Sequence, residues 1–268
     1  MIGQDKIINK ISNINMDNLP HSLIILGDKG SGRHTIFNMI VAKMQLPFFD
    51  ISDKLSHELI DEIYLKVEPI IYLINLDNIT IKESNMILKM VEEPLKNAFI
   101  IFIAKTKASI IPTILNRCQV WEMEKYNEDQ LKHFLTTVRD DYAGYFKLIN
   151  YCDTPGQLLY LMQSVDTLDN IKNMCDKIIT YIGSANFANT LTISDKIAFK
   201  NEQDKWDYDI FIKILYKTVQ NKLVLEYTKA LDNMFIVTSA LLKDSEIAHI
   251  NKRYLFENYL CTCRYIMR

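Results

Sequence analysis

The sequence predicts an α/β domain in which helices cover both faces of a parallel sheet, followed by a small helical domain and an all-α domain. Three short apolar runs, at residues 22–26, 70–74 and 98–104, lack polar alternation, which is typical of strands buried on both faces. Segments with helical spacing separate these runs, as in a doubly wound sheet. Beyond residue 121 polar and apolar residues recur with helical spacing, and from residue 167 onward we expect no strand.

The first domain is expected at residues 1–125. Its predicted strands and helices are Ser22–Leu26, Ile70–Ile74 and Ala98–Ala104 as strands, and Thr35–Met44 and Ser84–Glu93 as helices. The first strand ends abruptly at a glycine loop, which is a common connection between a strand and a helix. Pro94 is expected to stop the helix before it, because proline cannot continue the hydrogen-bond pattern.

Two helical domains are expected at residues 126–167 and 168–268. In the smaller one, Asn127–Gln130 has the residue types of a helix start and Thr154–Gly156 those of a turn. The larger one is predicted to hold four amphipathic helices, namely Asp169–Ile182, Trp206–Gln220, Leu223–Leu242 and Arg253–Met267. A polar stretch at Lys200–Lys205 is expected to be a loop.

Composition excludes several classes of protein. Apolar residues make up 49 % and charged residues 24 % of the 268 residues, as in ordinary globular proteins. A formal charge of −2 gives no basic footprint for nucleic acid. The five cysteines form no C-x-x-C pair, so neither zinc nor a disulfide framework is indicated. No run is long enough to span a membrane and the first residues lack a secretory design, so we expect a cytoplasmic protein.

Residues 27–35 contain an altered phosphate-binding loop, GDKGSGRHT. The pattern G-x-x-x-x-G-K-[ST] places backbone N–H groups and a lysine around phosphates and a hydroxyl on magnesium. The glycines Gly27, Gly30 and Gly32 are present, but Arg33 stands at the lysine position and His34 at the hydroxyl position. Thr35 comes one residue too late, and arginine is not a neutral replacement for lysine. We therefore expect a vestigial nucleotide loop, which leaves open residual binding of ATP, ADP or an anion at the helix N-terminus.

The next buried strand lacks the acidic residues of an ATPase. A working enzyme ends this strand with an Asp for magnesium and often a Glu that orients water. Ile74 and Asn75 occupy those two positions. The sequence therefore predicts that the chain itself does not hydrolyse ATP.

Residues 77–94 read DNITIKESNMILKMVEEP and closely resemble the segment A-D-x-M-T-x-x-A-A-N-A-L-L-K-x-L-E-E-P of bacterial clamp-loader AAA+ subunits. The segments IGQ at 2–4, PHS at 20–22 and IPTILNRCQ at 111–119 resemble the same family in the same order. The helical remainder, with TPGQ at 154–157, is similar to the lid and collar domains of the delta-prime class of DNA polymerase III. The resemblance implies an AAA+ module, a small lid and an all-α collar that assembles with other subunits.

The resemblance also assigns an arginine finger. In the family a Ser-Arg-Cys triplet carries an arginine that reaches the ATP of a neighbouring subunit, and Arg117 stands at that position, with Asn116 in place of the serine. An arginine supplied in trans stabilises charge on the transferred phosphoryl group and is worth about 10³- to 10⁵-fold in rate. Thr106 falls near the position of the family's sensor residue. Active members of the family also place an arginine near residues 155–156 to sense ATP, whereas this chain lacks that arginine and Gln157 is the nearest polar residue. Glu92 and Glu93 are expected only to end their helix, and no structural zinc is expected, since residues 45–68 contain no cysteine.

The leading hypothesis is a non-hydrolysing clamp-loader subunit that needs no cofactor. Its implied partners are the gamma/tau ATPase and delta subunits and, through the complex, the sliding clamp and primed DNA; alone it is expected to be a monomer. The alternative is an ATP-hydrolysing motor subunit of the gamma/tau type in which Arg33 does the work of the lysine. A self-contained P-loop kinase or DNA-binding switch is a third reading, but the sequence offers no clear substrate pocket or basic face for it.

Overall fold

The computed structural model describes residues 2–77, 79–93, 97–163, 165–182, 184, 188–198, 206–245, 247 and 250–266. The expected helix stop at Pro94 and the expected loop at Lys200–Lys205 lie outside these residues. The chain divides into two compact units, which are Met1–Asp140 with Thr154–Gly156, and Asp141–Asp153 with Gln157–Arg268. The three-part division at residues 125 and 167 stays a prediction.

The first unit is built on a five-stranded sheet with the order β2-β3-β4-β1-β5. All neighbouring strands are parallel. The strands are β1 (Ser22–Leu26), β2 (Phe48–Asp50), β3 (Ile70–Asn75), β4 (Ala98–Ala104) and β5 (Gln119–Glu122). Every residue of β1 and β4 is buried, which agrees with the unbroken apolar runs expected of strands covered on both faces.

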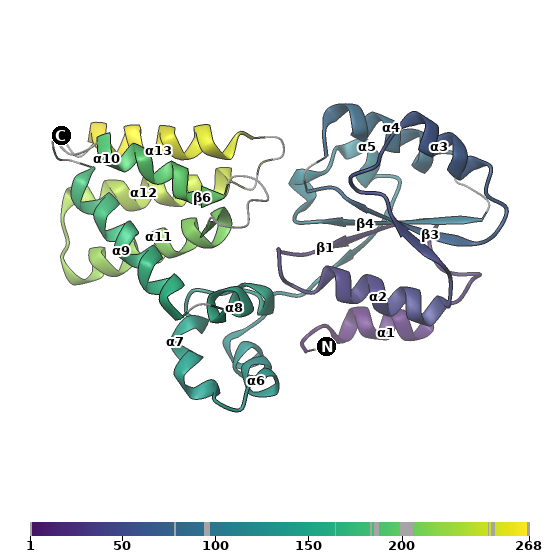
Figure 1. Cartoon of the computed structure of the whole chain (residues 1–268), viewed down its shortest axis with the longest axis horizontal. Helices are drawn as coiled ribbons and strands as arrows, with labels where there is room; N and C mark the ends of the chain where they lie inside the picture. Colours follow the sequence, from purple (N-terminus) through teal and green to yellow (C-terminus); the bar gives the residue numbers. More distant parts are fainter. Residues whose placement is uncertain are drawn as a thin grey trace. The chain divides into compact units, whose positions relative to one another are not determined.

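Helices cover the sheet on both faces, and each face has its own core (Figure 1). The helices α1 (Asp5–Asn13) and α2 (Arg33–Met44) lie on one face, and α3 (His57–Tyr64), α4 (Ile81–Glu92) and α5 (Pro112–Leu115) lie on the other. Alternate residues of one strand divide between the cores, since Leu23 and Ile25 face α2 while Ile24 and Leu26 face α4. The unit also contains the short helix η1 (Lys107–Ser109) and the helix α6 (Glu128–Val138).

The predicted fold class is confirmed, and most predicted elements of the first unit have close counterparts. The strands expected at Ser22–Leu26 and Ala98–Ala104 have those bounds, and α6 begins with a capping box formed by Asn127 and Gln130. The elements β2, α3 and β5 were not predicted. They are short, and β2 and β5 are exposed edges of the sheet that carry no continuous apolar run.

The second unit is mainly helical. Its elements are η2 (Tyr142–Tyr145), α7 (Phe146–Ile149), α8 (Pro155–Met162), α9 (Val165–Tyr181), α10 (Ala188–Leu191), η4 (Thr192–Lys196), β6 (Ile197–Ala198), β7 (Trp206–Asp207), α11 (Tyr208–Leu225), α12 (Lys229–Asp244) and α13 (Lys252–Ile266). Phe211 on α11 stacks on Trp206 and meets Phe256 of α13 edge-on, so aromatic rings form part of its core. The expectation of no further strand is wrong in one detail, because β6 and β7 form a two-residue parallel pair.

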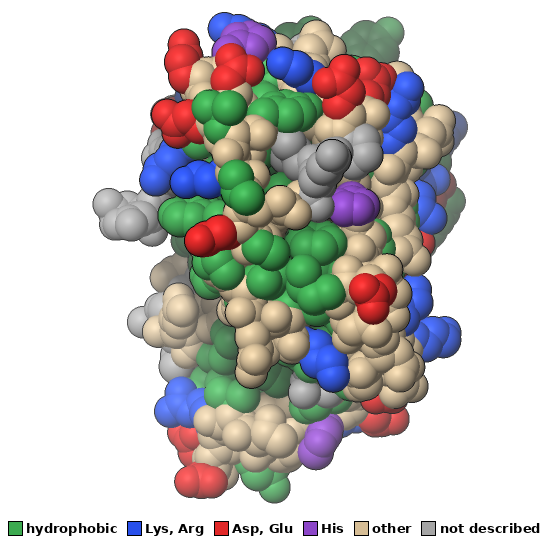
Figure 2. Space-filling model, turned by 90° about the vertical axis from the view of Figure 1, so that its right-hand side faces the viewer, with side chains coloured by type: hydrophobic (Ala, Val, Ile, Leu, Met, Phe, Trp, Pro, Cys, Tyr) green, Lys and Arg blue, Asp and Glu red, His purple; other side chains and the backbone are tan. Residues whose placement is uncertain are grey.

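One edge of the first unit has an apolar surface. The exposed large apolar side chains here include Phe48 and Phe49 on the edge strand β2 and Leu65 and Val67 before β3. Figure 2 shows apolar side chains gathered over much of the face that it presents. Exposed apolar areas of this kind often contact other proteins. Among the described helices, none has both the length and the apolarity needed to cross a membrane.

Candidate functional site

The glycine loop lies between β1 and α2, as the sequence predicts. Gly30 and Gly32 have positive φ angles of 82° and 102°, a region that residues with a Cβ rarely adopt. Gly27 is required for another reason, since a Cβ there would stand 2.6 Å from Oγ of Ser31 and 2.9 Å from Sδ of Met123. The three glycines therefore let the chain turn sharply into α2.

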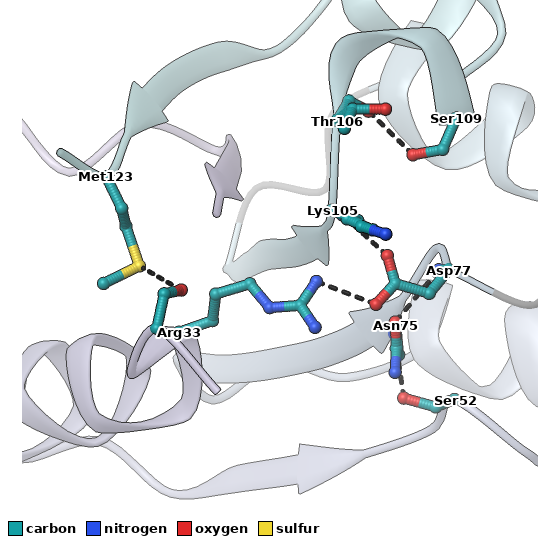
Figure 3. Close-up of polar contacts among 9 residues, drawn as sticks. Arg33, Ser52, Asn75, Asp77, Lys105, Thr106, Ser109 and Met123 are labelled. Atoms are coloured by element: carbon teal, nitrogen blue, oxygen red, sulfur yellow. Dashed lines mark hydrogen bonds and ion pairs between the residues drawn. The ribbon is translucent and has the colours of Figure 1, made fainter. Parts of the chain in front are cut away.

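Arg33 is the first residue of α2 and is almost fully buried, with 7 % of its side chain exposed. Its Nη1 atom lies 2.8 Å from Oδ2 of Asp77, at the far end of β3 (Figure 3). The two groups form an ion pair by distance, although no N–H of Nη1 is aligned for a hydrogen bond. The residue at the lysine position of the loop is thus paired within its own chain.

Asp77 is held in place from two sides. Its Oδ1 accepts a hydrogen bond of 2.6 Å from the backbone N–H of Lys105, which follows β4, and its own N–H donates to Oδ1 of Asn75. The N–H of Asn75 in turn donates to Oγ of Ser52 (Figure 3). The carboxyl ends of β3 and β4 therefore fix the carboxylate opposite Arg33. The motif at 77–94 contained this aspartate, but no pairing for it was predicted.

Three carbonyl groups of the glycine loop are hydrogen-bonded. Thr154 Oγ1 donates to the carbonyl of Lys29 at 2.9 Å, and the N–H of Gly156 donates to that of Gly30 at 2.9 Å. The hydroxyl of Tyr126 donates to the carbonyl of Ser31 at 2.7 Å. Burial raises the pKa of Tyr126, so the phenol keeps the proton that it donates. Tyr126 and Thr154 were not predicted to take part, because nothing in their local sequence indicates a contact with the loop.

The remaining residues of the expected nucleotide site differ in burial and in hydrogen-bond partners. Ile74 is fully buried at the end of β3, and Asn75 beside it bonds to Asp77. His34 and Thr35 are exposed on α2. Thr106 lies just after β4, where its hydroxyl is buried and has no hydrogen-bond partner among the described residues. Gln157 accepts hydrogen bonds from the N–H of Asp153 and from Lys213 within the second unit.

Arg117 lies in a different place, on the surface after the short helix α5. Its side chain is 42 % exposed, and Nη2 lies 3.0 Å from Oε1 of Glu92 at the end of α4. Nη1 donates to the carbonyl of Thr113 at 3.0 Å. Ile114 is buried on one side of it and Cys118 packs against the core on the other. The arginine is therefore presented outward from an anchored turn, and Glu92 has a role beyond ending the helix.

Cys118, the residue after Arg117 in sequence, adds no competing charge. Burial raises the pKa of the Cys118 thiol to about 12, so this side chain stays neutral at physiological pH. Glu92 is about half exposed. Exposed ion pairs are weak, at about 0–1 kcal/mol, so the pair with Glu92 orients the guanidinium without binding it firmly. Among the described residues no group of three potential ligands is placed to hold a metal ion.

Part of the chain is similar in sequence to known proteins. Residues 49–127, from β2 to the start of α6, match the protein family described as "DNA polymerase III, delta subunit". This segment includes Asp77, Glu92 and Arg117. A stretch of 60 residues is 35 % identical to DNA polymerase III subunit delta' of Haemophilus influenzae and covers 22 % of this chain. The match spans only 18 % of the length of that relative.

Two solved structures cover nearly the whole chain. A point mutant of RuvB from Thermotoga maritima aligns with a TM-score of 0.52 and 14 % identity over 96 % of this chain and 89 % of its own. A gamma subunit-related protein of DNA polymerase III from the same organism aligns with a TM-score of 0.47 and 14 % identity, over 99 % and 100 % of the two chains. The similarity to RuvB shows the fold alone.

Proposed function

We propose that this chain is a delta-prime-type subunit of the DNA polymerase III clamp loader that does not hydrolyse ATP, as the family match at residues 49–127 and the similarity to a delta' subunit support. In this proposal it assembles with gamma/tau ATPase and delta subunits in the cytoplasm and helps them load the sliding clamp onto primed DNA. Its own contribution to catalysis is Arg117, delivered to the ATP of a neighbouring subunit. It needs no cofactor of its own.

The contrast between the two arginines carries the proposal. Arg33, at the lysine position of the phosphate loop, is buried and paired with Asp77, whereas Arg117 is exposed and held by one weak ion pair and one hydrogen bond to a backbone carbonyl. A guanidinium that acts in trans must reach the surface and exchange its partner for a phosphate at little cost. Arg117 meets both conditions. Arg33 meets neither of them.

The end of β3 supports a non-hydrolysing role. Hydrolysis needs a carboxylate for magnesium and a group that orients the attacking water. Ile74 is buried in the core above α4, and the Asn75 amide is engaged by Asp77. The motor-subunit alternative would require Arg33 to leave Asp77 and would still lack an acidic pair at this strand.

Two exposed apolar areas support assembly with other subunits. One is the β2 edge with Phe48, Phe49, Leu65 and Val67. The other is the end of α11 and the loop that follows it, where Val224, Leu225 and Tyr227 are largely exposed. Side chains of this size are enriched where proteins associate. The chain's partners in the proposal are therefore proteins that cover these surfaces.

The test is the ATPase rate of the gamma/tau and delta subunits from the same source, with clamp and primed DNA, in the presence of this chain. We expect wild-type chain to raise the rate and Arg117→Ala to lose most of that gain, while still assembling in size-exclusion chromatography. Arg117→Lys is expected to recover only a small part, because an ammonium group lacks the planar fork.

Arg139→Ala is the matched control, since it removes another exposed arginine of the same unit from outside the motif. This variant should stimulate the mixture as wild type does. An Arg117→Ala chain that assembles and stimulates fully would contradict the finger role. Loss of stimulation in both variants would also count against it.

A further inference from the structure

We propose that Asp77 is a built-in anion for the glycine loop. Its carboxylate takes the place of the phosphate that the residue at the Arg33 position contacts in a nucleotide-binding loop. This inference deepens the proposed function, because it names what holds the loop together in a subunit that does not hydrolyse ATP. Its consequence is specific. The chain is prevented from binding polyphosphate by its own carboxylate, and not only by the residues missing from its loop.

The ion pair places a carboxylate beside the residue that contacts phosphate in loops of this kind. In a phosphate-binding loop, the residue after the last glycine of the pattern contacts the terminal phosphates. Here that residue, Arg33, is oriented across the sheet toward Asp77, and its Nη1 lies 2.8 Å from the carboxylate. An arginine that is 7 % exposed requires a counter-charge, because a buried unpaired cation is strongly unfavourable. Asp77 provides that charge from the same chain.

The carboxylate is fixed before any ligand arrives. The backbone N–H of Lys105 donates to its Oδ1 and leaves Oδ2 for Arg33. Figure 3 shows the guanidinium and the carboxylate facing one another, with Lys105 and Asn75 around Asp77. An incoming polyphosphate would have to displace this oriented anion and would meet its negative charge at close range. Competition of this kind lowers affinity for any anion at the loop.

The loop itself is also held closed. The carbonyls of Lys29, Gly30 and Ser31 accept hydrogen bonds from Thr154, Gly156 and Tyr126. The contact between Gly156 and Gly30 is so close that a Cβ on Gly156 would stand 2.4 Å from Cα of Gly30. The loop therefore keeps its shape through contacts within the first unit, and Asp77 completes it by neutralising Arg33.

The proposal predicts that neutralising Asp77 creates polyphosphate affinity. The experiment is isothermal titration calorimetry of the purified full chain with sodium tripolyphosphate at fixed ionic strength. Asp77→Asn keeps an oxygen for the Lys105 N–H but removes the charge. We expect it to bind roughly tenfold or more tightly than wild type, as the gain of a charge-assisted contact with Arg33 implies. Arg33→Gln added to Asp77→Asn should abolish the gain.

Asp28→Asn is the matched control, because it removes the same charge from the loop itself without touching the partner of Arg33. Its affinity for tripolyphosphate should rise far less than that of Asp77→Asn, because Arg33 stays paired with Asp77. Asp77→Ser is the second variant, used if circular dichroism shows that Asp77→Asn is unfolded, and should show the same gain. No gain in a folded Asp77 variant would overturn the proposal. So would an equal gain in Asp28→Asn, or wild-type binding as tight as that of Asp77→Asn.

These results are separable from those for the proposed function. If the Asp77 variants gain no tripolyphosphate affinity but Arg117→Ala still loses ATPase stimulation, the built-in anion is overturned and the trans arginine stands. The reverse pattern would overturn the trans arginine while the internal counter-ion stands.

Discussion

Gly156 and Gly30 approach one another more closely than any pair of residues with side chains could. A Cβ added to Gly156 would lie 2.4 Å from Cα and 3.0 Å from the carbonyl oxygen of Gly30, and both are backbone atoms with little freedom to move. We predict that Gly156→Ala destabilises the chain by about 1–3 kcal/mol, the usual cost of overpacking. Urea unfolding followed by far-ultraviolet circular dichroism measures this.

Gly144 offers a matched control for the same substitution. A Cβ at Gly144 would meet nothing within 4 Å, and its φ angle is not in the left-handed region. Gly144→Ala should therefore be neutral or slightly stabilising, because alanine restricts the unfolded chain. Equal losses of stability for the two variants would mean that the contact of Gly156 with Gly30 contributes nothing.

At the scale of single residues, the sequence predicts positions better than partners. Arg33 and Arg117 could be located from motifs, because the motifs fix their distance from a glycine or from a strand. Their partners, Asp77 and Glu92, could not, since each pairing depends on which strand or helix ends nearby in the fold. Tyr126 reaches Ser31 across 95 positions of sequence, and no local pattern indicates such a contact.

At the scale of elements, local sequence sets the start of α4, and the stability of this helix start is expected to depend on pH. Thr80 caps the helix, and Glu83 completes a capping box by accepting hydrogen bonds from the N–H and hydroxyl of Thr80. These bonds, first from the side chain and then from the backbone of Thr80, lower the pKa of Glu83. The carboxylate form therefore stabilises the start of the helix that carries the family motif.

The direction of the pH effect follows from that lowered pKa. A group whose pKa is lower in the folded state contributes stability above its unfolded value, about 4.3 for Glu, and loses that contribution as pH falls through the folded value. We predict that Glu83→Gln is less stable than wild type near neutral pH and that this difference is smaller at about pH 3, below the unfolded value. Urea midpoints at the two pH values test this, with Trp121 fluorescence in a Trp206→Phe background reporting on the first unit.

The capping box of α6 is the control, because its third residue is Gln130, which does not titrate. Gln130→Ala should lower the urea midpoint by a similar amount at both pH values. A loss at Glu83 that persists unchanged at low pH would contradict the role of its charge.

The elements that could be predicted are those with a strong local signal. Strands buried on both faces give unbroken apolar runs, and Asn127 with Gln130 gives a helix start. The edge strand β2 has three exposed residues and forms through pairing with β3 alone. The pair β6 and β7 has two residues in each strand. Such elements are set by pairing with another strand, so their own local periodicity does not reveal them.

At the scale of the whole molecule, both candidate sites lie in the first unit and at different places on it. The glycine loop is at the carboxyl ends of β1, β3 and β4, and Arg117 is beside the end of α4. The family match at residues 49–127 includes Arg117 and leaves out the glycine loop. The second unit holds its own aromatic core and the exposed turn after α11. In the proposed function, only the Arg117 site acts on a neighbouring subunit.

The central claim is that the chain has no ATP hydrolysis of its own, and the most direct test is the steady-state ATPase rate of the purified chain alone with saturating magnesium and ATP. We predict a rate no higher than that of the Arg33→Ala variant prepared in parallel, at every chain concentration. A rate that rises in proportion to the wild-type chain and is lost in Arg33→Ala would contradict the account. It would make this chain a motor subunit whose Arg33 leaves Asp77 to bind nucleotide.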